Sequence, residues 1–303
     1  MHASGRQYEL EHGAYRAAVA SVGASLRGLT HRGRDLVRSF GADEVRPRFR
    51  GAVLAPWPNR VPDGRWTWRG QTHQLALTEP EHASALHGLV CWLDWHEVEV
   101  GSDTVVLGTR VWPQQGYPFA LDLTMRWRLG ADGLDAELSA VNVGGEPAPY
   151  GCSIHPYLTA PAGGYVDDWT LHLPAARRLE VDDRLRVVGT AEQPPPHADF
   201  NRARPVRGTA IDHAYTGLAF DSTDTAAVTV TDPAGDGVQM TFGPRTPWVQ
   251  VHTADRPDEP GHHRRGLAVE PMTCPPEALA TGLDLIVLDP GESVSVPWRI
   301  AAV

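Results

Sequence analysis

The 303-residue sequence contains no lysine, and all 27 of its basic residues are arginine. Schiff-base formation and the attachment of pyridoxal phosphate both require a lysine amine. The sequence therefore excludes these two routes to carbonyl chemistry. Any reaction that this protein performs at a carbonyl carbon proceeds without an imine between enzyme and substrate.

Cysteine is scarce as well. The three cysteines, Cys91, Cys152 and Cys274, are odd in number and far apart in the chain. They form neither a disulfide framework nor a C-x-x-C metal pair. We therefore expect reduced thiols in a reducing compartment.

Long apolar runs and a basic charge balance are also missing. No stretch approaches the roughly 18 apolar residues that a membrane-spanning helix needs, so no membrane partner is expected. The small-residue run at 17–25 lacks the leucine-rich core of a signal peptide, and we expect a cytoplasmic protein. The formal charge of -10 argues against a nucleic-acid partner. The arginine cluster at 46–50 (RPRFR) does not alter this, because without a glycine-rich context it is typical of a solvated face.

Helical periodicity is nearly absent, and a period of two dominates. Residues 121–129 and 134–143 alternate apolar and polar side chains, as half-buried strands do. Hairpins are predicted over 65–77 and 226–242, further strands over 248–253 and 293–300, and one short helix over 275–282. With 30 glycines and 26 prolines between short strands, the pattern predicts a single all-β domain over residues 1–303, a large antiparallel β-sandwich.

Polar residues interrupt the alternating strand pattern at four places that are flanked by proline or apolar residues. Asn59 and Arg60 lie between prolines, His87 and His155 lie among apolar residues, and Glu270 lies in the apolar stretch GLAVEPMTCPP. A carboxylate persists in such a place when it is paired or when its raised pKa is useful.

Each of these residues also has a structural interpretation. A single histidine among apolar residues is usually a satisfied core histidine. Asn59 and Arg60 are compatible with a turn and a surface ion pair, and Glu270 with a buried carboxylate tied to an arginine. Tyr157, which follows His155 closely, suits core packing.

The same residue types are also common metal ligands. His87, His155 and Glu270 are a chemically plausible ligand set for zinc, but no H-E-x-x-H-like local pair supports it. The adjacent His262 and His263 are followed by two arginines, which repel a cation. We expect no metal and no cofactor.

Six short motifs occur in an order that resembles the aldose 1-epimerase (galactose mutarotase) family. They are WPNR, LHGLV, HPYL, IDHAYTGL, WVQVHT and GLAVEPMTCPPEAL, running from about residue 50 to near the C-terminus. The N-terminal stretch YRAAVASVGASLRGL is similar to the first strands of that family. The resemblance implies a galactose mutarotase-like supersandwich with a sugar-binding cleft.

The resemblance also implies roles for individual residues. His155 matches the general acid, Glu270 the general base and His87 the second catalytic-cleft histidine. The matching substrate-binding positions are Asn59, Arg60, Tyr157, Asp212 and Gln250. The sequence departs from the best-known members, which have Gly-Arg-x-x-Asn-Arg and His-Gly-Gly where this chain has APWPNR and HGLV. The departure resembles a bacterial branch of less settled specificity, and it concerns the substrate more than the reaction.

The expected function is interconversion of the α and β anomers of a small-molecule sugar. This needs a base at the C1 hydroxyl and an acid at the ring oxygen. A glutamate with a raised pKa and an imidazolium near its reference pKa of about 6.5 suit these tasks. Two alternatives are a non-catalytic carbohydrate-binding sandwich and a mutarotase-like enzyme for phosphorylated sugars, which would need basic residues at the cleft rim. A monomer or homodimer is expected.

Overall fold

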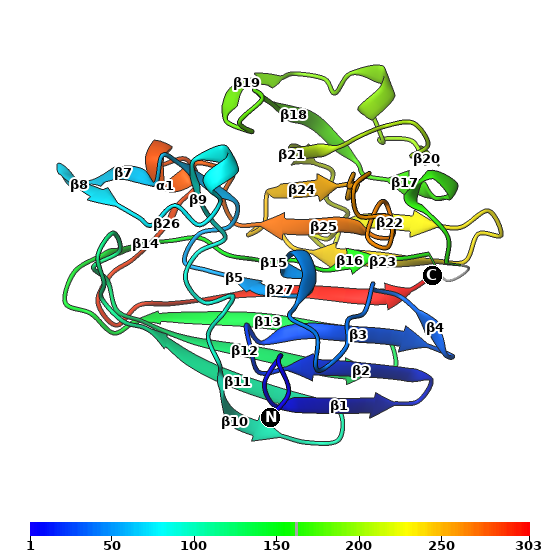
Figure 1. Cartoon of the computed structure of the whole chain (residues 1–303), viewed down its shortest axis with the longest axis horizontal. Helices are drawn as coiled ribbons and strands as arrows, with labels where there is room; N and C mark the ends of the chain where they lie inside the picture. The colour runs from blue at the N-terminus through cyan, green and yellow to red at the C-terminus, as the bar shows by residue number, and fades with distance from the viewer. Residues whose placement is uncertain (161–162) are drawn as a thin grey trace.

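The computed structural model describes residues 1–160 and 163–303 and consists almost entirely of β-strands (Figure 1). The paired strands of its sheets run antiparallel. The one α-helix in this part of the chain, α1 (Ala278–Thr281), lies within the predicted helix and ends at Gly282, where φ is 77°. The prediction of a large antiparallel β-sandwich is confirmed.

The largest sheet has nine strands and shows the predicted alternation. In β12 (Leu121–Gly130) and β13 (Gly133–Asn142), apolar side chains at every second position are buried. Successive side chains of a strand point to opposite faces, so one face of this sheet packs on the core. The sheet order is β10 (His96–Val100), β11 (Thr104–Val111), β12, β13, β27 (Ser293–Ala302), β23 (Gly237–Phe242), β22 (Ala226–Thr231), β17 (Thr170–His172) and β20 (Arg204–Pro205).

A six-stranded sheet carries much of the site. Its order is β16 (Tyr157–Leu158), β25 (Leu267–Met272), β24 (Trp248–His252), β21 (Asp212–Leu218), β18 (Ala175–Val181) and β19 (Val187–Ala191). Every residue of β25 is buried, on both faces of the sheet. A strand covered on both faces has no solvent side to fill with polar residues, which explains why the stretch around Glu270 is continuously apolar.

A four-stranded N-terminal sheet completes the sandwich. Its strands are β1 (Gln7–His12), β2 (Tyr15–Ala20), β3 (Ser25–His31) and β4 (Arg34–Asp35). They contact β11 and β12 of the nine-stranded sheet and are drawn in blue in Figure 1. One hydrophobic cluster joins the three sheets, with Val19, Trp127 and Val249 as examples from each.

Short paired strands connect the sheets around the site. The pairs are β6 (Arg60–Pro62) with β9 (Ser84–Leu86), β7 (Arg65–Trp68) with β8 (Gln71–Gln74), β5 (Val53–Leu54) with β15 (Ser153–Ile154), and β14 (Ala148–Tyr150) with β26 (Ile286–Leu288). The β7–β8 and β22–β23 hairpins confirm the predicted hairpins. The 3-10 helices are Pro47–Phe49, Pro80–His82, Val166–Asp168 and Pro196–Ala198.

The three cysteines are free, as predicted from their number and spacing, and all three are buried. Across residues 1–160 and 163–303, no helix has the length and apolar character needed to cross a membrane.

Candidate active site

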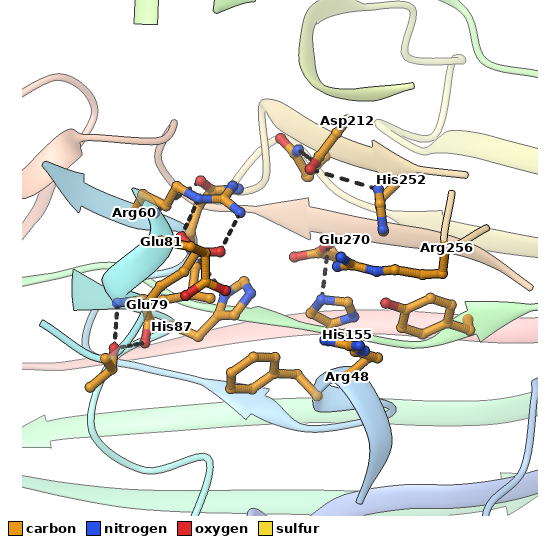
Figure 2. A pocket seen from close by; sticks show the side chains of 16 residues that line it. Arg48, Arg60, Glu79, Glu81, His87, His155, Asp212, His252, Arg256 and Glu270 are labelled. Carbon is orange, nitrogen blue, oxygen red and sulfur yellow. Dashed lines mark hydrogen bonds and ion pairs between the residues drawn. The ribbon is translucent and has the colours of Figure 1, made fainter. Parts of the chain in front are cut away.

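A pocket opens between one face of the six-stranded sheet and the β6–β9 pair (Figure 2). All eight residues that the sequence suggested for the site line it: Asn59, Arg60, His87, His155, Tyr157, Asp212, Gln250 and Glu270. The structure therefore brings together residues that lie up to 211 positions apart in the chain (270 − 59 = 211).

Strand register explains how three of them meet. Gln250 of β24 is paired with Glu270 of β25, and one step along the same face His252 of β24 is paired with Asp212 of β21. Residues directly opposite each other, and residues two apart in one strand, point to the same face of a sheet. Asp212, Gln250 and Glu270 therefore present their side chains to the same side, together with His252.

The centre of the pocket is a buried histidine–carboxylate pair. Nε2 of His155 lies 3.3 Å from Oε1 of Glu270, and the side chains are only 6% and 2% exposed. The His155 ring is stacked on Tyr157, with centroids 5.2 Å apart, and meets the His87 ring edge-on at 5.1 Å. The backbone of His155 is fixed by hydrogen bonds to Ala52 and Gly51. His155 is thus held through its ring and its backbone, and Glu270 through the pairing of β25 with β24.

Burial shifts the pKa values of this pair in opposite directions. Desolvation, reinforced by the charge of Asp212, raises the pKa of Glu270 well above its usual value. Desolvation also lowers the pKa of His155 to about 3, so the reference value of 6.5 expected for this histidine is wrong here. The uncharged forms, a protonated Glu270 and a neutral His155, are the ones that burial favours. Their contact allows one proton to pass between them.

Several buried polar atoms at the site lack a hydrogen-bond partner within the described chain. They include Oε2 of Glu270, Nδ1 of His155 and Oε1 of Gln250. Buried polar groups are almost always hydrogen-bonded, because an unmade bond leaves the desolvation cost uncompensated. These atoms are therefore available to bond a polar ligand in the pocket.

His87 is held by Asn59 through two hydrogen bonds. The backbone N–H of Asn59 donates to Nδ1 of His87 at 3.2 Å, and the N–H of His87 donates to the carbonyl of Asn59 at 2.9 Å. Burial, followed by the positive charges of its neighbours, lowers the pKa of His87 well below 6.5, so the ring is neutral. A neutral ring that accepts at Nδ1 carries its proton on Nε2, which makes Nε2 a donor.

Asn59 and His87 also have unusual backbone conformations. Asn59 and His87 have φ values of 55° and 62°, in the left-handed region that few non-glycine residues adopt. Gly88 follows with φ of 75°, and a Cβ there would lie 2.0 Å from the carbonyl oxygen of Ala55. Such conformations persist where the surrounding structure enforces them, and they cluster at functional sites.

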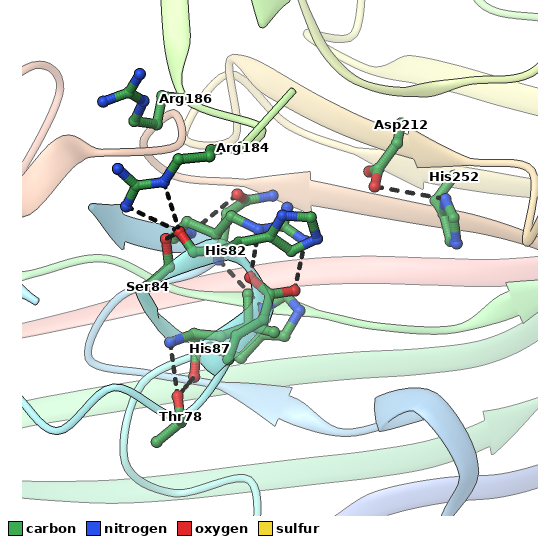
Figure 3. A network of polar contacts seen from close by, with 12 residues as sticks. Thr78, His82, Ser84, His87, Arg184, Arg186, Asp212 and His252 are labelled. Carbon is green, nitrogen blue, oxygen red and sulfur yellow. Dashed lines mark hydrogen bonds and ion pairs between the residues drawn. The ribbon is translucent and has the colours of Figure 1, made fainter. Parts of the chain in front are cut away.

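Arg60 forms a bidentate ion pair with Glu79. Its Nε and Nη2 atoms donate to the two carboxylate oxygens at 2.6 and 2.8 Å, and the side chains are 12% and 10% exposed. Figure 3 shows how the segment carrying Glu79 is held. The backbone N–H of Leu86 donates to Thr78 Oγ1, and Arg184 donates to the carbonyl of His82. The guanidinium of Arg60 is thereby oriented at the pocket wall.

Asp212 is held beside the sheet by polar neighbours. Nε2 of Gln250 donates to its Oδ1 at 2.6 Å, and Nδ1 of His252 lies 3.7 Å from its Oδ2. Burial opposes ionisation, but His252, Arg60 and the bond from Gln250 together bring the pKa of Asp212 below its usual value. Asp212 is therefore an ionised acceptor in the pocket.

The profile of the family described as aldose 1-epimerase matches residues 6–301. This match covers nearly the whole chain. The chain belongs to the aldose 1-epimerase family. Two proteins from Escherichia coli strain K12 are similar to this chain over nearly its whole length. The uncharacterized protein YihR is 35% identical over 96% of this chain and 92% of its own length, and the uncharacterized protein YphB is 27% identical over 95% and 96%.

Solved structures of other aldose 1-epimerase family proteins share the fold. A putative aldose 1-epimerase from E. coli K12 has a TM-score of 0.85 at 24% identity, covering 98% of this chain and 99% of its own. A GalM/aldose epimerase homologue from C. elegans has the same TM-score and coverage at 18% identity. Galactose 1-epimerase from Lactobacillus acidophilus NCFM has a TM-score of 0.78 at 20% identity, covering 97% and 93%.

The pocket also contains residues that the sequence analysis missed. They are Arg48, Phe49, Thr78, Glu79, Glu81, Leu86, His252 and Arg256. His252 was within reach of sequence reasoning, because it lies two positions after Gln250 in a period-two strand. Leu86 is the last residue of the short strand β9. The others come from connections between strands, where no periodic pattern marks the inward-facing positions.

The interpretation of residues 46–50 as a solvated face is wrong for two of the three arginines, whereas Arg48 is exposed. Arg46 and Arg50 are 4% and 5% exposed. Arg46 donates to backbone carbonyls of Val22 and Cys91 and lies over the ring of Trp92 at 4.3 Å. These arginines are buried by acceptors from distant segments. Proline and phenylalanine between them were the available signal, because a solvated basic face rarely contains either.

A cation remains geometrically compatible with the centre of the pocket. Ligand atoms of His87, His155 and Glu270 lie within 4.8 Å of one another. The structure thus places the zinc-like set considered from the sequence in one location. Activity after treatment with a chelator distinguishes a metal-dependent reaction from an acid–base reaction that uses the same residues.

Proposed function

We propose that this protein is an aldose 1-epimerase that interconverts the α and β anomers of an aldose, with Glu270 as general base and His155 as general acid. The single observation that carries this proposal is the 3.3 Å contact between these two buried side chains. Membership in the aldose 1-epimerase family supports an isomerase. A site that only bound sugars would have no need for two titratable groups with opposed pKa shifts.

Ring opening moves two protons, one to Glu270 and one from His155, so the total number of protons on the pair does not change. Glu270 removes the proton from the C1 hydroxyl while His155 donates one to the ring oxygen, and the bond between C1 and the ring oxygen breaks. The product is an open-chain aldehyde beside a protonated Glu270 and a neutral His155, the forms that burial favours. After rotation about the C1–C2 bond, the same transfers run in reverse and close the ring on the other face.

The remaining residues are suited to holding the sugar in one orientation. Arg60 and the Nε2 proton of His87 offer donors, and the ionised Asp212 offers acceptors. Gln250, Asn59 and Tyr157 provide further polar atoms along the walls. Directional contacts of this kind fix the hydroxyls, and fixed geometry is what lets an acid and a base act together on two oxygens.

The proposal is tested by following freshly dissolved α-D-glucose and α-D-galactose by polarimetry with and without the protein. Acceleration of the approach to the anomeric equilibrium, beyond the uncatalysed rate, is the expected result. Binding of these sugars without any acceleration would identify a non-catalytic carbohydrate-binding sandwich instead. If neither sugar is bound or converted, and other aldoses are equally inert, both the epimerase and the carbohydrate-binding function are contradicted.

A further inference from the structure

Arg256 is a pocket cation that no acid neutralises. The other two arginines of the pocket have acidic partners: Arg60 pairs with Glu79 and Arg48 with Glu259. In the described part of the chain, Arg256 forms no ion pair and its side chain makes no hydrogen bond, although it lines the pocket. Glu81, which forms no ion pair with any residue that the structure describes, lies on the opposite side, with Arg60 (Figure 2).

Arg256 and Arg48 are presented by two segments that are joined to each other. Arg256 belongs to the connection between β24 and β25, and Glu259 of the same connection binds Arg48. Arg48 and Phe49 have φ values of 50° and 58°, two successive residues in the left-handed region. This strained turn faces the pocket, where retained strain is a mark of function.

Both arginines lie on the His155 side of the pocket. Figure 2 shows Arg48 and Arg256 beside His155 and away from Arg60, and Tyr157, which is within electrostatic reach of Arg256, stacks on His155 at 5.2 Å. If His155 serves the ring oxygen, then C5, which is bonded to that oxygen, lies on this side too. The substituent of C5 therefore leaves the ring toward Arg48 and Arg256.

We propose that the pocket takes an aldose whose C5 substituent carries an anionic group, namely a carboxylate, sulfonate or phosphate. Arg256 is its principal partner and Arg48 its second. A guanidinium binds such groups through paired, charge-assisted hydrogen bonds, and these are stronger than bonds to a neutral hydroxyl. The inference rests on the proposed function, because the orientation follows from the role of His155.

The test compares D-glucose with three anionic analogues: D-glucuronate, 6-deoxy-6-sulfo-D-glucose and D-glucose 6-phosphate. Exchange between the anomeric signals is measured by NMR above the uncatalysed rate, and Kd by calorimetry. We expect at least one anionic sugar to exceed glucose about ten-fold in kcat/KM, and the best of the three identifies the group. Because the contacts are partly exposed, the advantage should shrink as salt is raised.

Two variants test whether Arg256 is responsible for the preference for anionic sugars. Arg256→Gln should lower the ratio of anionic to neutral kcat/KM about ten-fold, whereas Arg202→Gln, which removes an exposed arginine outside the pocket lining, should leave the ratio unchanged. The inference would be overturned if glucose were turned over and bound as well as, or better than, all three anionic sugars. An unchanged ratio of anionic to neutral kcat/KM in Arg256→Gln would also overturn it. If no sugar is converted, the proposed function fails, and the Kd ratios alone decide the inference.

Discussion

Nε2 of His155 lies 3.3 Å from Oε1 of Glu270, and together the two side chains form one titrating unit. A protonated Glu270 with a neutral His155 and an ionised Glu270 with an imidazolium hold the same number of protons. Changing the pH therefore does not interconvert them, whereas a proton transfer within the pair does. The pair loses its working state only when it gains a proton in acid or loses one in alkali, and the two apparent pKa values belong to the pair.

The substitution Glu270→Gln should abolish turnover while sparing sugar binding. The amide keeps the size and polarity of the side chain but cannot accept the proton from the C1 hydroxyl. We expect kcat to fall by roughly 10²–10⁴-fold with Kd changed far less. Polarimetry and calorimetry on the same preparation provide the measurement. Near-wild-type turnover would remove Glu270 from the role of base.

The same variant should be more stable than the wild type at alkaline pH. Burial raises the pKa of Glu270 above the value of 4.5 that it has when unfolded. In this window the native state holds a proton that the unfolded chain has released, so stability falls as the pH rises. Glutamine does not titrate, and the Tm advantage of Glu270→Gln should therefore grow from pH 5 to pH 8. Glu192→Gln, on the exposed surface, is the matched control and should show no such trend.

His155→Asn distinguishes chemistry from packing. If His155 protonates the ring oxygen, the variant should stay folded and lose roughly 10²-fold or more in kcat. The wild-type pH profile of kcat should be bell-shaped. The alkaline limb should flatten in the variant, because only Glu270 remains to titrate and it must be ionised to act as base. An unaltered bell accompanied by a lower Tm would show that His155 is a packing residue.

The ion pair between Arg60 and Glu79 should matter for stability as well as for binding. Both side chains are mostly buried, so Glu79→Gln leaves a buried guanidinium without its counter-charge. We expect a loss of about 3 kcal/mol in the free energy of unfolding, measured by urea denaturation. The double variant Arg60→Met with Glu79→Leu should recover most of this loss. A double variant as unstable as the single one would contradict the electrostatic explanation.

Chelation tests the alternative use of His87, His155 and Glu270 as metal ligands. An acid–base reaction between these residues needs no cation, so prolonged dialysis against a chelator should leave kcat unchanged. The measurement is polarimetric activity before and after dialysis, with metal content determined in parallel. Loss of activity that is restored by adding Zn²⁺ would replace the acid–base proposal with a metal-assisted one.

The fold follows from local sequence patterns. Alternation in residues 121–129 and 134–143, and turns rich in glycine and proline, sufficed to predict strands and hairpins that the structure contains. Side-chain alternation is a property of neighbouring residues, so it is readable from the chain. Rigid flanking residues and apolar surroundings also drew attention to His155 and Glu270 before any tertiary contact was known.

The pocket residues that lie in connections between strands could not be predicted from local sequence patterns. Glu79, Arg48 and Arg256 lie in connections whose side-chain directions depend on left-handed backbone positions and on hydrogen bonds to distant segments. The burial of Arg46 depends on carbonyl groups of Val22 and Cys91, which are 24 and 45 residues away. These placements are decided by packing, because no neighbouring residue in the sequence specifies them.

The sequence by itself determined the period-two strands, the exclusion of lysine chemistry, and the presence of a histidine and a glutamate whose residue types suit proton transfer. Only the tertiary structure decided that His155 and Glu270 touch, that burial moves their pKa values apart, and that an unpaired Arg256 joins them in one pocket. Residue type sets which proton a group can carry. The free energy of carrying it depends on the solvent that packing removes and on the charges that folding brings near.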